Sequence, residues 1–176
     1  ISQCASRRYV KCSARRYEFY SHKRSVFQAT MNALTLSATI EGKQKVVALE
    51  EYLANMPQIP IDTFHTFHAG VYARTILIPT GVALTGAHIT IPTLLVINGH
   101  ATVTLGDEVI DVEGYQIIPA AANRKTAYYA RRDTHITMIF ASDAITVEEA
   151  ENQFTDDADR LMSRSNNNLI LKKETI

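Results

Sequence analysis

Residues 71–142 decide the fold, and they read VYARTILIPT GVALTGAHIT IPTLLVINGH ATVTLGDEVI DVEGYQIIPA AANRKTAYYA RRDTHITMIF AS. Short runs rich in Val, Ile, Thr and Tyr alternate there with Gly, Pro and Asp, which favour turns. The expected strands are residues 71–77, 82–84, 88–91, 93–97, 101–105, 108–112, 115–119, 125–130 and 135–141. The expected turns include 79–81, 85–86, 98–99, 106–107, 113–114 and 131–133. This spacing predicts a mainly-β domain, either a sandwich or a small antiparallel β-barrel.

A first amphipathic helix is expected before the barrel. Residues 43–56, KQKVVALEEYLANM, place apolar side chains close to helical spacing. The expected apolar stripe comprises Val46, Val47, Leu49, Leu53 and Met56. Pro57 and Pro60 end the helix, because proline lacks the backbone N–H and disfavours a helical residue before it. We expect this helix to lie against the barrel and cover an open end or edge.

A second amphipathic helix is expected after the barrel, over residues 146–164. Thr146 can act as its N-cap, and Glu148 in the first turn suits the positive end of the helix dipole. The expected apolar stripe comprises Val147, Ala150, Phe154, Ala158 and Leu161. The run SRSNNN, residues 163–168, ends this helix. The tail LILKKETI, residues 169–176, is expected either to be disordered or to add a strand to a neighbouring chain.

The formal net charge of zero hides an uneven distribution of charge. Residues 1–30 carry seven Lys or Arg residues and one acid, whereas the rest carries eleven basic and seventeen acidic residues. A basic arm on an acidic body can bind nucleic acid, a membrane surface or the acidic face of a neighbouring subunit. Because the run belongs to no recognisable nucleic-acid-binding module, we favour a protein-binding arm. Its candidate contact residues are Arg7, Arg8, Arg15 and Arg16.

Length and composition limit the class of protein. A chain of 176 residues, 46% hydrophobic and 20% charged, suits one soluble domain with extensions. No apolar run approaches the roughly 18 residues of a membrane helix, and no apolar signal-peptide region is present, so we expect no membrane partner.

Cys4 and Cys12 lack a second ligand pair at zinc-finger spacing, and we expect two thiols in a reducing compartment. Composition shifts at Met31, so residues 1–30 are interpreted as a processed or fragmentary start, or an upstream extension. Four parts are expected: a basic arm (1–30), a linker and helix (31–60), the barrel (61–142), and a C-terminal helix and tail (143–176).

The order of the turns resembles the cupin superfamily, whose members are small β-barrels of the jelly-roll type. Metal-binding cupins carry two histidines and a glutamate before a hairpin glycine, and a third histidine in a second motif. Aligned on Gly99, the resemblance places these four ligand positions on Gly86, His88, Pro92 and Arg124. The second motif also matches at Gly114 and Pro119. Only one of the four ligand positions is a metal ligand here, so the resemblance implies a cupin barrel that is used for something other than metal chemistry.

A narrower resemblance covers about half of the chain. The stretches ARTILIPTGVALTGAHIT, VINGHATV and ANRKTAYYARRDTHITMIFASDAITVEEAENQFTDD are similar to small cupin-like proteins encoded by tailed bacteriophages. The shared order is a Thr-Gly turn with a following His, a hairpin glycine, an Arg-x-x-x-Tyr strand, an Asp-Thr step and an acidic helix. The matching residues are Thr85, Gly86, His88, Gly99, Arg124, Tyr128, Asp133 and Thr134. This resemblance implies a role in virion assembly more than any known reaction.

Four histidines are weighed as metal ligands. His88 could bind a metal ion from a barrel strand, and a catalytic site needs about three protein ligands. His100, or His65 and His68 of the HTFH run, would have to supply the others. The alternative, which we favour, is that these histidines form local hydrogen bonds or lie at the surface. We therefore predict no metal site, no cofactor and no catalytic residue.

Arg124 gives a more specific hypothesis than the histidines do. It is grouped with Tyr128, His88 and His100 as a candidate pocket or interface. An arginine at a metal-ligand position can grip a carboxylate through two parallel hydrogen bonds. A structural ion pair with Asp133, or with an acid of a partner chain, is the interpretation that we favour for Arg124.

The favoured function is a non-enzymatic structural or adaptor protein of a bacteriophage virion, made in the host cytoplasm. Its partners would be other virion proteins and copies of itself, with nucleic acid a less favoured partner. One alternative is a metal-dependent cupin enzyme of the dioxygenase or isomerase type. Another is a cupin that binds a small molecule or glycan, with Arg124, Tyr128 and His88 lining the pocket. The sequence leaves the identity of any small-molecule ligand open.

Overall fold

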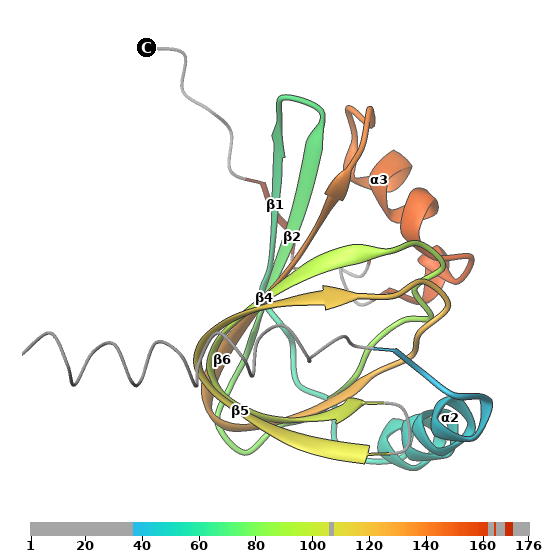
Figure 1. Ribbon diagram of the computed structural model, residues 1–176, viewed down its shortest axis with the longest axis vertical. Coiled ribbons are helices and arrows are strands. Elements are labelled where there is room, and N and C mark those ends of the chain that lie inside the picture. Colours follow the sequence, from blue (N-terminus) through green and yellow to red (C-terminus); the bar gives the residue numbers. More distant parts are fainter. Residues whose placement is uncertain (1–36, 106–107, 162–163, 165–167, 171–176) are drawn as a thin grey trace, which may run out of the picture. The chain divides into compact units, whose positions relative to one another are not determined.

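The computed structural model describes residues 37–105, 108–161, 164 and 168–170, which all fall in one compact unit, Thr35–Ile176. The candidate arm residues Arg7, Arg8, Arg15 and Arg16 lie outside the described residues. The unit is a mainly antiparallel β structure with one helix before the sheet and one after it (Figure 1), which confirms the predicted fold class. Within the described part of the chain, no helix is long and apolar enough to cross a membrane.

The described strands form one seven-stranded sheet. They are β1 (Thr63–His68), β2 (Val71–Ile78), β3 (Ala83–Thr85), β4 (Thr93–Leu105), β5 (Glu108–Ala120), β6 (Ala127–Ala141) and β7 (Asn168–Ile170). The order is β5-β4-β6-β2-β1-β7, and β3 pairs with β6. All pairs are antiparallel except β1 with β7, which is parallel. The strands β4, β5 and β6 curve strongly (Figure 1), so the sheet bends over its own inner face.

Long strands replace several of the short strands that the sequence predicts. The turns expected at 98–99 and 113–114 are wrong, because β4 and β5 run through them and Gly99 pairs with Gly114. Both glycines have positive φ, 148° and 80°, and the pairing of β4 with β6 shifts register around residue 99. A positive φ serves a β-bulge as well as a turn, and a bulge bends the strand without reversing it. The reversal lies between Leu105 and Glu108, as their pairing shows, and this confirms the turn predicted at 106–107.

The turn expected at 131–133 is also wrong, because β6 is continuous. Its residues alternate between buried and exposed from Thr134 to Ala141, as a strand with one buried face does. Arg131, Arg132 and Asp133 are all exposed where the register against β4 shifts. Three consecutive polar residues in a sequence predict a turn, but here they mark an irregular stretch within a long strand.

Two further strand predictions need correction. The strand expected at 88–91 is reduced to one bridge, between Ile89 and Arg124. The strand β1 was not predicted at all, because its sequence TFHTFH is half polar. The start of the tail pairs within its own chain, since β7 lies beside β1.

The first helix, α2 (Ile40–Ala54), begins and ends earlier than predicted. Thr39 caps it: its side-chain oxygen accepts a hydrogen bond from the Gly42 N–H at 2.9 Å. Of the predicted stripe only Val46 is fully buried, whereas Val47, Leu49 and Met56 are exposed. The helix therefore rests on the barrel through a narrow contact.

The second helix, α3 (Val147–Phe154), is much shorter than the predicted 146–164. Its start agrees with the prediction: Thr146 Oγ1 accepts from the Glu149 N–H at 3.2 Å, and Glu149 Oε2 accepts from the Ile145 N–H at 3.0 Å. The helix ends at Phe154 because Thr155 is extended, with φ −152° and ψ 144°, and its hydroxyl accepts from the Asp157 N–H at 3.2 Å. A short 3₁₀ turn, η1 (Ala158–Arg160), follows.

A chain of aromatic rings joins α3 to the sheet. Phe154 lies edge-on to Phe140 of β6 at a centroid distance of 6.0 Å, and Phe140 contacts Tyr72 of β2 at 5.3 Å. All three rings are buried. Such contacts add to the burial of apolar area, so they fix the position of α3 and of the segment after it.

Candidate functional site

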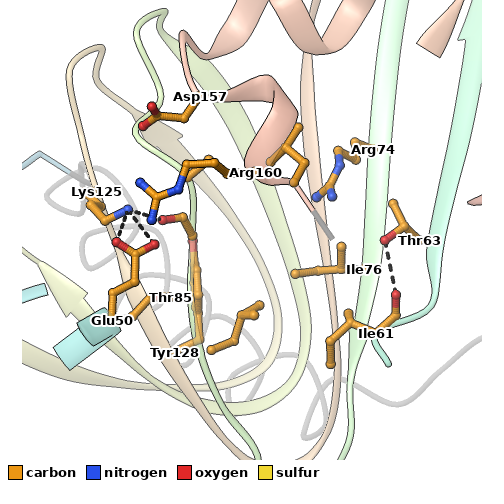
Figure 2. Close-up of a pocket in the computed structure, with 14 residues that line it drawn as sticks. Glu50, Ile61, Thr63, Arg74, Ile76, Thr85, Lys125, Tyr128, Asp157 and Arg160 are labelled. Atoms are coloured by element: carbon orange, nitrogen blue, oxygen red, sulfur yellow. Dashed lines mark hydrogen bonds and ion pairs between the residues drawn. The ribbon is translucent and has the colours of Figure 1, made fainter. Parts of the chain in front are cut away.

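A cavity of about 160 Å³ lies between β1, β2, β3, the start of β6 and η1, with Glu50 of α2 at its edge (Figure 2). A smaller chamber of about 80 Å³ shares six lining residues with it, among them Arg74 and Tyr128. The apolar part of the main wall consists chiefly of Ile61, Ile76, Leu84 and Leu161. Three basic side chains also line it, namely Arg74, Lys125 and Arg160.

Strand register places the first basic residue on the cavity. Tyr72, Arg74, Ile76 and Ile78 share one face of β2, because side chains of a strand alternate between its faces. Tyr72 and Ile78 at the two ends of this row are fully buried. Arg74 is thus a charged residue on the inner face of the sheet, and Figure 2 shows its side chain at the cavity on the side of Thr63.

Arg74 is incompletely satisfied within the described structure. Its Nε atom is buried and has no described hydrogen-bond partner. Burial lowers the pKa of Arg74, while the neighbouring Tyr72 and Glu151 act in the opposite direction. A buried donor without a partner costs free energy, so this position favours an acceptor supplied from elsewhere.

Lys125 forms the opposite side of the cavity. Its Nζ lies 3.1 Å from each Glu50 carboxylate oxygen and 3.1 Å from the Gly86 carbonyl oxygen. The Lys125 side chain is only 8% exposed and that of Glu50 is 29% exposed. This ion pair is therefore screened less by solvent than one at the surface.

The 3₁₀ turn η1 supplies the third cation. Arg160 is exposed, and Figure 2 places its guanidinium group on the same side as Lys125 and Glu50, near Asp157. The cavity thus has two basic sides, one formed by Arg74 and the other by Lys125 with Arg160. Two acids, Glu50 and Asp157, lie among the same lining residues.

Of the predicted pocket residues, Tyr128 lines both chambers. It is buried, and burial raises the pKa of its phenol, against the opposing effects of Arg124 and of a hydrogen bond with Thr126. The neutral phenol can donate a hydrogen bond to a bound molecule.

Arg124 lines only the smaller chamber, and its expected pairing with Asp133 is wrong. Its guanidinium group donates to the Ala121 carbonyl at 2.7 Å, to the Ile91 carbonyl at 3.3 Å and to Thr93 Oγ1 at 2.6 Å. Asp133 instead accepts two hydrogen bonds from Thr80, from its N–H and its hydroxyl, both at 2.8 Å. Arg124 therefore connects loop segments at the wall of the chamber, and its N–H donors bind acceptors of the protein itself.

The histidines that were weighed as metal ligands do not form one cluster. His65 is fully buried and its Nδ1 lies 2.7 Å from the Tyr72 hydroxyl oxygen, whereas His100 Nε2 lies 2.7 Å from Asp111 Oδ2. His88 lies between two cavity residues, Ala87 and Ile89, without lining either chamber, and its buried Nε2 has no described partner. In the described ranges, no group of three His, Cys, Asp or Glu side chains is placed to hold a metal ion.

Four residues of the site are not predicted from the sequence, namely Arg74, Lys125, Arg160 and Glu50. The sequence does contain a signal for Arg74. In a mostly apolar strand it lies two residues from both Tyr72 and Ile76, so its side chain shares their buried face, and an unpaired charge is rarely buried. The other three carry no local signal, because they come from a helix, a loop and a 3₁₀ turn that meet only in the folded chain.

Comparisons with known proteins bear on the fold. No protein-family model matches the sequence, and no curated protein matches it. A cupin superfamily protein from Desulfitobacterium hafniense is similar in structure, with 16% identity and a TM-score of 0.41, over 52% of this chain and 86% of that one. An RmlC-like cupin family protein from Methanocaldococcus jannaschii has 16% identity and a TM-score of 0.40, over 50% and 84% of the two chains. KdgF from a Halomonas species has 15% identity and a TM-score of 0.42, over 49% and 84%.

Proposed function

We propose that the protein is a non-enzymatic binding module whose cavity takes a small carboxylate with an apolar body. The observation that carries the proposal is the buried Arg74 Nε, which has no described partner at the wall of a cavity. Buried polar groups in proteins are normally hydrogen-bonded, so an acceptor arriving in the cavity would remove an unfavourable term. The proposal assigns no reaction to the cavity.

The chemistry of the walls favours a carboxylate with a hydrocarbon part. The planar guanidinium group of Arg74 matches the geometry of a carboxylate, and Lys125 adds positive charge from the other side. The hydroxyls of Thr63, Thr85 and Tyr128 are further polar groups at the wall. The apolar wall residues would cover a hydrocarbon body, as is usual in small-molecule sites.

The size of the cavity limits the ligand to a small molecule. A cavity of about 150 Å³ in another protein holds a benzene ring, and the main chamber here is about 160 Å³. Benzoate is therefore a suitable probe, and benzamide is its neutral counterpart of the same shape.

We expect Arg74→Met to weaken benzoate binding by about 10- to 100-fold, because a hydrogen bond to a charged group contributes roughly 1.5–3 kcal/mol. The ligand-free variant should be at least as stable as the wild type, since the substitution removes a buried, incompletely paired donor. Titration calorimetry measures the first effect, and thermal unfolding without ligand measures the second.

Arg132→Met is the matched control, because Arg132 is exposed and pairs with Glu113 on the outer surface. It should bind benzoate as the wild type does. Equal binding of benzamide and benzoate, or undiminished binding by Arg74→Met, would contradict the proposal.

We also propose an adaptor role for the outer face of α2, in which it associates with a second copy of the chain. Ile40 and Val47 are seven residues apart and therefore share one face of the helix, where they are 70% and 41% exposed. Exposed apolar residues that lie together favour a contact surface more than single ones do. Val47→Glu should then shift the protein toward monomer in sedimentation analysis, while a wild type that is already monomeric at high concentration would count against this role. Membership of a virion is proposed from the sequence resemblance, and mass spectrometry of purified phage particles tests it.

A further inference from the structure

The helix α2 is attached to the barrel at few points. Only Gly42 and Val46 are buried among its residues, and most of its other side chains are exposed. Glu50 makes a charged contact with the barrel, through Lys125. This ion pair therefore contributes to the position of α2.

Lys125 is held by two groups of the protein. Its Nζ donates hydrogen bonds to Glu50 Oε1 and to the Gly86 carbonyl oxygen, both at 3.1 Å, and lies 3.1 Å from Glu50 Oε2 in the same ion pair. Figure 2 shows this arrangement at the edge of the cavity. An anion that enters and approaches Lys125 competes with Glu50 for its positive charge.

Glu50 is the acceptor that the anion would displace. The Gly86 carbonyl is neutral, and its residue is held in place by a hydrogen bond from the Gly86 N–H to the Thr126 carbonyl at 2.8 Å. The Glu50 carboxylate has the same charge as the anion, so the two repel each other at the cavity edge. Glu50 and the ligand thus compete for one buried cation.

We infer that carboxylate binding in the cavity and docking of α2 on the barrel oppose each other through Lys125. This inference rests on the proposed function, because it needs an anion in the cavity. Coupling between two sites is reciprocal, so a bound anion loosens α2 as much as a docked α2 weakens the anion. Since α2 also carries the exposed Ile40 and Val47, the ligand would control the presentation of that surface.

The test combines benzoate titration with hydrogen exchange of the full chain, followed by mass spectrometry. In the wild type, saturating benzoate should speed amide exchange in α2 severalfold and leave exchange in β4 and β6 unchanged. Glu50→Gln should bind benzoate about tenfold more tightly, within the usual 5- to 150-fold range of coupling. Exchange in its α2 should be fast already without benzoate and change little when benzoate is added.

Glu51→Gln is the matched control, because Glu51 is the exposed neighbour on the same helix and does not line this cavity. It should behave as the wild type in both measurements. Benzoate binding of equal strength to wild type and Glu50→Gln, with no change in α2 exchange, would overturn the inference and leave the proposed function standing. Absence of benzoate binding to all three proteins would overturn the proposed function and the inference with it.

Discussion

Gly99→Ala should destabilise the protein by about 3 kcal/mol or more, since it forces a side chain into a tightly packed strand contact. An added Cβ would lie 2.5 Å from Thr134 Oγ1, 2.6 Å from the Asp133 carbonyl oxygen and 2.7 Å from Thr134 Cα. Two of these three atoms belong to the backbone of β6. The third is fixed, because Thr134 Oγ1 accepts from the His100 N–H at 3.0 Å and donates to the Arg132 carbonyl at 2.7 Å.

Gly81→Ala separates this clash from the effect of backbone conformation. Gly81 also has positive φ, 81°, but a Cβ there would meet nothing within 4 Å. We expect a loss of only about 1 kcal/mol, the cost of placing alanine in the left-handed region. Urea unfolding of both variants measures the difference, and equal losses would show that packing against β6 is not the cause.

Arg164→Ala should destabilise the protein by about 2–3 kcal/mol, because it removes the cation from a buried carboxylate. Glu151 of α3 is fully buried, and Arg164 Nε lies 2.9 Å from its Oε2 atom. Arg164 also contacts Asp159 Oδ1 at 2.9 Å and Asn152 Oδ1 at 3.0 Å. One guanidinium group thus holds α3 and η1 together, and η1 forms part of the cavity wall.

Arg132→Ala is the comparison for this ion pair. The side chains of Arg132 and Glu113 are 62% and 65% exposed, and exposed pairs contribute at most about 1 kcal/mol. Thermal unfolding of the two variants tests whether burial of the partner carboxylate sets the size of the effect. Arg164→Lys should recover part of the loss, because lysine keeps the charge but lacks the planar fork that reaches several acceptors.

The proposed function and the coupling of α2 depend on different residues, so they can be tested apart. Arg74 supplies the unpartnered donor that favours a ligand, and it has no described contact with α2. Glu50 acts on the ligand through the cation that it shares with the cavity and through its own negative charge. Loss of binding in Arg74→Met and gain of binding in Glu50→Gln are therefore effects of opposite sign at one site.

The sequence by itself determined the features that arise from neighbouring residues. Strand character from β-branched residues, the cap at Thr146 and the burial of Ala150 and Phe154 were all predicted and all hold. Each depends on interactions within a few positions of the chain, which a local pattern records.

Only the tertiary structure decided what the glycines do and where the site lies. Gly99 could serve a hairpin turn or a bulge, and the pairing of β4 with β6 selects the bulge. The helix α3 ends where Thr155 becomes extended, and the aromatic contact of Phe154 and the ion pair of Arg164 hold the segment around it, although the apolar pattern continues to residue 161. The cavity joins Glu50, Arg74, Lys125 and Arg160, residues that are far apart in the chain. Long-range pairing and packing bring such groups together, and local sequence patterns do not encode which distant charges will share one cavity.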